Sequence, residues 1–161
     1  SISRGYVCCH CTSGENSSSD GTELKYENIF NTLKESCENM RVTDSNSISA
    51  IQNLRSKGIK VVIATDNMDT FRRFTIPAMG LEKYFDGFLI SNELCAYKYQ
   101  TIGKKIPFFD EYLMKNDLTY SDIVLLDDCQ DKTGIYKELG FEIELIKSPM
   151  VVTEILRKYS N

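Results

Sequence analysis

Two short stretches of the chain end in side chains that suit phosphate chemistry. Asp127 and Asp128 follow one apolar run. Thr65 follows another, and Lys98 lies on a polar stretch between the two. Paired carboxylates supply the oxygen ligands that Mg²⁺ prefers, whereas a hydroxyl and an ammonium group donate hydrogen bonds to phosphate oxygens. Each residue alone is also explained by a strand end or a solvated loop, so the indication comes from their order and spacing together.

The elements expected around these residues would bring them to one edge of a sheet. Unbroken apolar runs are typical of strands in a parallel sheet, and they predict strands at 6–11, 60–64, 88–91 and 123–127. Residues 141–146 alternate apolar and charged side chains, which predicts an edge strand with one solvent-exposed face. Helical apolar spacing predicts helices between consecutive strands and a last helix that Ser148-Pro149 begins. Because the carboxyl ends of parallel strands meet at one edge, the hydroxyl, the ammonium group and the carboxylates are expected to converge.

The alternation of strands and helices predicts an α/β fold. We expect a three-layer α/β/α sandwich with a Rossmann-like parallel sheet of about five strands, the first strand being central. No repeat, linker or low-complexity segment marks a second domain, so residues 1–161 are expected to form a single one. Residues 12–46 would form a loop and helix insertion, and the helix expected from Met68 would end or kink at Pro77.

Composition and charge narrow the class of protein. The net charge is −4 without a basic run, so no nucleic-acid surface is indicated. No apolar run approaches the length of a transmembrane helix, and the start of the chain does not resemble a signal peptide. The six cysteines lack the spacing of a small disulfide-rich domain. We therefore expect buried thiols in a cytoplasmic protein that does not associate with membranes.

In its motifs the chain resembles the haloacid dehalogenase (HAD) superfamily of phosphohydrolases, over about residues 42–147. The run 61–67 is similar to the second motif of the family, and the run 79–87 is similar to the approach to its third strand. Lys98 resembles the lysine of the third motif, and Asp127-Asp128 resembles the fourth motif. The resemblance implies phosphate binding by Thr65, Asp66, Asn67 and Lys98, and Mg²⁺ binding by Asp127 and Asp128. The short segment before the second strand implies a capless or minimally capped member with an open site.

Two positions near these motifs differ from the family pattern. Tyr99 follows the motif lysine where the family usually has proline, and Lys132 stands five residues after Asp127, where the family often has Asp or Asn. With fewer carboxylates around the ion, Mg²⁺ binding is expected to be weak or absent.

The first motif departs most from the family, whose strand ends in Asp-x-Asp. The run 6–14 reads Tyr-Val-Cys-Cys-His-Cys-Thr-Ser-Gly, which contains no carboxylate. With four apolar residues, 6–9, before the motif, His10 takes the position of the family nucleophile and Thr12 that of the general acid. A shift of one residue would place Cys9 and Cys11 there instead, on the opposite face of the strand. Little or no hydrolysis through an aspartyl phosphate is therefore expected, whereas a phosphohistidine at His10 stays open.

A zinc site at Cys8-Cys9-His10-Cys11 is not expected. Neighbouring residues on a strand point to opposite faces, so they cannot surround one tetrahedral ion. The later run 18–22, Ser-Ser-Asp-Gly-Thr, imitates the end of the first motif, but the polar residues before it do not form a buried strand.

Two functions remain open. The chain is either a HAD-like phosphatase with an altered nucleophile, or a non-catalytic HAD-like module that recognises a phosphorylated ligand or protein partner. A response-regulator receiver domain uses similar residue types. Its acidic pair lies on the first strand and its lysine comes last, however, so the order here argues against it.

Overall fold

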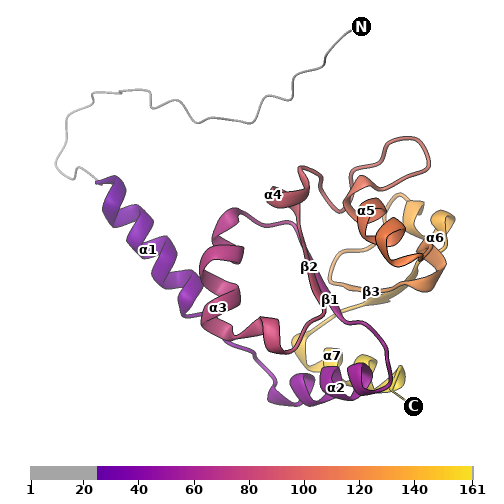
Figure 1. The fold of residues 1–161 in the computed structure, drawn as a ribbon, viewed down its shortest axis with the longest axis horizontal. Coiled ribbons are helices and arrows are strands. Elements are labelled where there is room, and N and C mark those ends of the chain that lie inside the picture. Colours follow the sequence, from indigo (N-terminus) through magenta and orange to yellow (C-terminus); the bar gives the residue numbers. More distant parts are fainter. Residues whose placement is uncertain (1–24, 161) are drawn as a thin grey trace, which may run out of the picture.

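The computed structural model of the protein describes residues 25–160, which form helices and short strands in alternation (Figure 1). In chain order these are α1 (Tyr26–Glu38), α2 (Ser45–Ser56), β1 (Val62–Thr65), the π-helical turn η1 (Phe71–Thr75), α3 (Ile76–Met79), the 3-10 turn η2 (Leu81–Lys83), β2 (Gly87–Ile90), α4 (Ser91–Leu94), α5 (Pro107–Asn116), the 3-10 turn η3 (Tyr120–Asp122), β3 (Val124–Asp127), α6 (Ile135–Leu139), β4 (Glu142–Leu145) and α7 (Pro149–Lys158). The strands expected at 60–64, 88–91, 123–127 and 141–146 are confirmed to within two residues.

The sheet differs from the prediction. β1 pairs in parallel with β2, with Thr65 opposite Ile90, and β3 pairs in parallel with β4, with Asp127 opposite Leu145. Within residues 25–160 these are two separate two-stranded sheets. The prediction of one Rossmann-like sheet of about five strands in a three-layer sandwich is therefore wrong. Apolar patterns mark each strand and its parallel crossover, but they carry no signal for whether β1 and β3 also join, and the expected central strand 6–11 lies outside the described residues.

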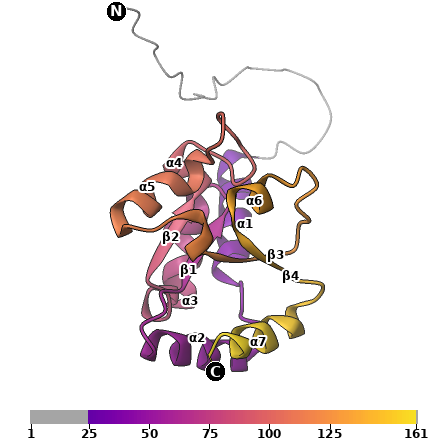
Figure 2. The same cartoon turned by 90° about the vertical axis from the view of Figure 1, so that its right-hand side faces the viewer.

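The largest hydrophobic cluster packs α5 and α6 against β3 and β4 (Figures 1 and 2). Its centre is aromatic: the Phe109 ring lies 4.9 Å from Phe108 and 5.3 Å from Phe141, centroid to centroid. Tyr136 is 1% exposed and packs 4.9 Å from Phe141. Such edge-to-face contacts add to the burial of the rings, so this cluster holds the loops on either side of β3 in place.

Two other clusters hold the remaining elements. In both views α2 and α7 lie side by side at one end of the molecule, where Leu54 and Leu156 are buried. Asp44 ties these helices together, because its carboxylate accepts hydrogen bonds from the Asn46 amide at 2.9 Å and from the Thr153 hydroxyl at 2.6 Å. The third cluster packs η1, α3 and η2 against β2.

Several local predictions are confirmed and others are corrected. Pro107 and Pro149 lie in the first turns of α5 and α7, and Gly140 ends α6 with φ of 102°. Pro77, however, lies in the first turn of α3, directly after η1, and the chain stays helical to Met79. A proline without an N–H is tolerated in a first turn, which explains why it does not end the helix.

The described cysteines are more exposed than expected, and α1 is largely exposed as well. Cys95 and Cys129 are exposed free thiols and Cys37 is half-buried, so the prediction of buried thiols is wrong for two of the three described cysteines. α1 contains no buried residue, although Phe30 packs edge-on against Phe74 at 5.9 Å. No helix within residues 25–160 is long and apolar enough to cross a membrane.

Candidate functional site

The residues expected at the strand ends come together around one lysine. Lys98 lies on the loop between α4 and α5, and its Nζ lies 2.8 Å from Oδ2 of Asp127, the last residue of β3. Its backbone N–H donates to Oδ1 of Asp66, which follows β1, at 3.0 Å. One loop residue therefore links the carboxyl ends of β1 and β3, although these strands belong to different sheets.

Lys98 is held at three points. Besides the contacts to Asp127 and Asp66, its carbonyl oxygen accepts a hydrogen bond from the Tyr136 hydroxyl. Tyr136 lies in the aromatic cluster, so this hydrogen bond anchors the loop that carries Lys98 to the packed core. The Lys98 side chain is 15% exposed and that of Asp127 is 4% exposed. The lysine side chain is thus fixed in a largely buried position, with a small part of its surface exposed.

Asp127 is ionised although it is buried. Burial alone raises the pKa of a carboxyl. The hydrogen bonds from Lys98 and from the Cys129 amide outweigh this effect and hold the pKa of Asp127 below its ordinary value. The Cys129 N–H donates to Oδ1 at 2.8 Å, so each carboxylate oxygen already has a partner.

Tyr99 contributes an aromatic wall to the site. Its ring packs edge-on against Tyr136 at 5.5 Å, and the Lys98 ammonium lies 5.9 Å from its centroid. Burial, and secondarily the negative charge of Asp127, raise the pKa of Tyr99, so its hydroxyl stays protonated at neutral pH. The residue that departs from the family pattern after the lysine is therefore part of the site.

Thr65 and Asn67 are placed at the same edge but differ in their contacts. Thr65 ends β1 and is half-buried, and its hydroxyl makes no hydrogen bond within the described part of the chain. Asn67 is used locally: its Oδ1 accepts from the Met68 amide at 2.9 Å, and its N–H donates to the Ser91 hydroxyl. Thr65 keeps a donor for a ligand, whereas the Asn67 side chain acts mainly as a turn-forming group.

The carboxylates offer a limited site for a cation. Ligand atoms of Asp127, Asp128 and Cys129 all lie within 4.8 Å of one another, with Asp128 and Cys129 exposed. Two carboxylates fit Mg²⁺, but the third neighbour is a thiol, which suits softer metals. Lys132, five residues after Asp127, is exposed and adds a positive charge to the same loop. The donor set accommodates Mg²⁺ with fewer oxygen ligands than the ion prefers.

His10 and Thr12 lie outside the described residues, so their assignment to the positions of the nucleophile and the general acid stays a prediction. The same holds for the alternative register through Cys9 and Cys11. The remaining predicted residues, Thr65, Asp66, Asn67, Lys98, Asp127 and Asp128, lie on strand ends and loops of the described part.

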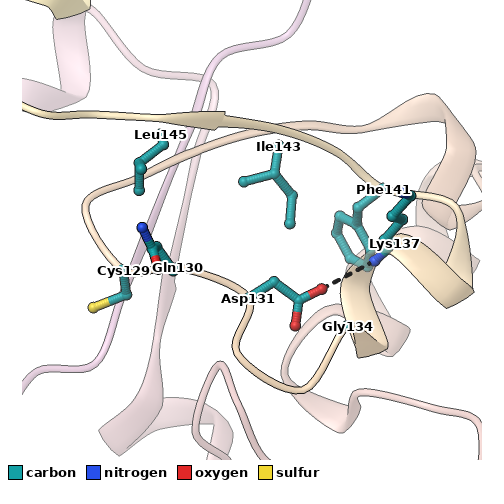
Figure 3. A pocket seen from close by; sticks show the side chains of 8 residues that line it. All are labelled: Cys129, Gln130, Asp131, Gly134, Lys137, Phe141, Ile143 and Leu145. Carbon is teal, nitrogen blue, oxygen red and sulfur yellow. Dashed lines mark hydrogen bonds between the residues drawn. The ribbon is translucent and has the colours of Figure 1, made fainter.

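Beside this edge the loop after β3 borders two hollows that the sequence did not reveal. One, of about 430 Å³, lies between the loop and β4 and is shown in Figure 3. Cys129, Gln130 and Leu145 line one side, and Asp131 and Lys137 lie opposite. The second, of about 630 Å³, shares those first three residues and includes Asp128 and Lys147. Lys147 carries no motif, so only the parallel register of β3 and β4 reveals its place beside the site.

Comparison of the sequence with protein-family models and with curated proteins finds no match.

Proposed function

We propose that the protein is a HAD-like domain that binds the phosphate group of a phosphorylated ligand at the edge formed by Asp66, Lys98 and Asp127, with weak or absent phosphohydrolase activity. The observation that carries the proposal is the three-point attachment of Lys98. A lysine ammonium group has three N–H donors. One is given to Asp127, which leaves two for phosphate oxygens.

The neighbouring groups have complementary roles. The Thr65 hydroxyl would donate to a third phosphate oxygen, since it makes no hydrogen bond among residues 25–160. Asp127 orients the ammonium group and keeps it charged through their 2.8 Å pair. Mg²⁺ bound by Asp127 and Asp128 would neutralise part of the phosphate charge. The arrangement thus binds and orients a phosphate group. These two steps of phosphoryl transfer need no nucleophile.

Weak hydrolysis follows from the proposed positions of His10 and Thr12. The threonine hydroxyl has too high a pKa to act as a general acid near neutral pH, and histidine would attack phosphorus from a differently shaped side chain. General acid–base catalysis alone is worth roughly 10²–10⁴-fold in rate. Losing it together with the aspartate nucleophile would leave turnover close to background.

A second candidate is recognition of a phosphorylated protein by the same site, without catalysis. The loop that carries Lys98 also exposes Tyr97 and Ile102, at 67% and 63%. Large exposed apolar side chains beside a phosphate site suit contact with a protein segment better than contact with a small polar metabolite.

Phosphate binding is tested by thermal unfolding of the full chain in increasing concentrations of inorganic phosphate. A ligand that binds the native state raises the unfolding temperature. We expect this increase in the unmodified protein and its loss in Lys98→Gln. The matched control is Lys104→Gln, which removes a charge from the same loop where the side chain is 85% exposed. Equal phosphate stabilisation of all three proteins would contradict the proposal.

A further inference from the structure

The larger hollow beside the phosphate edge carries its own positive charges. It opens beyond the carboxyl ends of β3 and β4, and Lys132 and Lys147 both line it. Neither lysine takes part in an ion pair within residues 25–160, and the lining contains one carboxylate, Asp128. In a protein of net charge −4 this is a locally basic hollow.

The strand register fixes this hollow next to the proposed phosphate site. Asp127 lies opposite Leu145 in the parallel ladder. The Ile146 amide then donates to the Asp127 carbonyl at 2.8 Å, and Lys147 is the next residue. Lys147 is therefore two residues beyond the end of the β3–β4 pair, where Asp127 holds the Lys98 ammonium group. Asp128 follows Asp127 and lines this hollow, so the hollow begins one residue from the carboxylate that pairs with Lys98.

The two hollows lie next to each other around the loop after β3. Cys129, Gln130 and Leu145 line both, and the floor continues to Ile143 (Figure 3). Together they are lined by the apolar residues Ile143 and Leu145, by three lysines (Lys132, Lys137 and Lys147) and by two carboxylates (Asp128 and Asp131). Such a layout suits an elongated ligand with a charged group at its end.

We infer that the hollow lined by Lys132 and Lys147 binds a second anionic group of the same ligand, so that the ligand is a small molecule carrying a phosphate and a further phosphate or carboxylate. This inference rests on the proposed phosphate site at Lys98. Two linked anions engaging two basic sites gain from effective concentration, because the second contact becomes intramolecular.

The test compares alkylphosphonates, which carry one anionic group, with alkane diphosphonates of two, four and six carbons, by calorimetric titration of the full chain. We expect one diphosphonate to bind at least about tenfold more tightly than the monophosphonate of the same length. An alkylphosphonate ending in carboxylate, of that length, shows whether the second group is best a phosphate or a carboxylate.

The variants separate the inference from the proposed function. Lys132→Gln with Lys147→Gln is expected to remove the advantage of the diphosphonate and leave the affinity for the monophosphonate unchanged. Lys104→Gln with Lys115→Gln matches the loss of charge at exposed positions away from the hollow and is expected to change neither. Equal affinity for both ligand classes at every length, or an advantage that survives in the Lys132/Lys147 variant, would overturn the inference and leave the phosphate site standing. Absence of binding by any phosphonate would overturn both.

Discussion

Replacing Lys98 with methionine tests whether the pair with Asp127 organises the site. Methionine keeps most of the apolar stem and removes the ammonium group. It leaves the Asp127 carboxylate 4% exposed, with the Cys129 amide as the partner of one oxygen and no cation on the other. Removing one partner of a buried ion pair costs about 3–5 kcal/mol, because the remaining charge stays buried and uncompensated. We expect a loss of this size in the free energy of unfolding.

The assay is urea denaturation followed by far-ultraviolet circular dichroism, since the chain contains no tryptophan. The matched control is Lys104→Met, which breaks the exposed pair with Glu138, and exposed pairs contribute about 0–1 kcal/mol. Adding Asp127→Asn to Lys98→Met removes the stranded charge and keeps an acceptor for the Cys129 amide. The double variant should therefore be less destabilised than the sum of the single ones, with a coupling of about 0.5–3 kcal/mol.

The same pair predicts the pH dependence. The pKa of Asp127 in the folded protein lies below its ordinary value of 3.8. Its stabilising contribution is therefore complete above the ordinary value and is lost as the pH falls through the lowered pKa. The cost of Lys98→Met should be largest near neutral pH and should shrink in acid. A cost below about 1 kcal/mol at pH 7, or strict additivity in the double variant, would refute the reasoning.

Three further predictions concern the surroundings of the pair. Tyr136→Phe removes the hydrogen-bond donor to the Lys98 carbonyl and keeps the packed ring. We expect the free energy of unfolding in urea to fall by about 1 kcal/mol, together with weaker stabilisation by phosphate. Unchanged stabilisation by phosphate would show that the core does not position the loop. Titration calorimetry should show weak Mg²⁺ binding that Asp127→Ala abolishes, and tight stoichiometric binding would contradict the limited donor set. With p-nitrophenyl phosphate and Mg²⁺, the unmodified protein should be near background and His10→Asp with Thr12→Asp should gain turnover. Brisk turnover of the unmodified protein that survives His10→Ala would place the nucleophile elsewhere.

Local structure followed the sequence closely where one physical signal dominates. The apolar runs before Thr65 and Asp127 formed strands as predicted, although β1 is half-buried throughout and only alternate residues of β3 are buried. Pro107 began a helix and Gly140 ended one, because their backbone preferences match those positions. Ser148 precedes its helix as expected, yet its side chain makes no capping hydrogen bond. A residue type thus indicates a boundary more reliably than it indicates the contact made there.

Features that depend on contacts between residues far apart in the sequence could not be predicted from local sequence patterns. The sequence placed Lys98 and Asp127 on separate loops, and their order alone suggested that they meet. The burial of Lys98 and Asp127 and the hydrogen bond from Tyr136 arise from packing between residues far apart in the sequence. Lys98 and Asp127 are 29 residues apart, and Lys98 and Tyr136 are 38 residues apart. The separation into two sheets has the same origin. Hydrogen bonding between β1 and β3 is a tertiary property that neither strand's pattern encodes.

The most direct test of the central claim is a crystal structure of the full chain soaked with Mg²⁺ and tungstate as a phosphate mimic. The account predicts the anion within hydrogen-bond distance of Lys98 Nζ and the Thr65 hydroxyl, with the Lys98–Asp127 pair intact. The same soak of Lys98→Gln should leave this position empty. Tungstate bound elsewhere at full occupancy, with none at the edge between Asp66 and Asp127, would contradict the account.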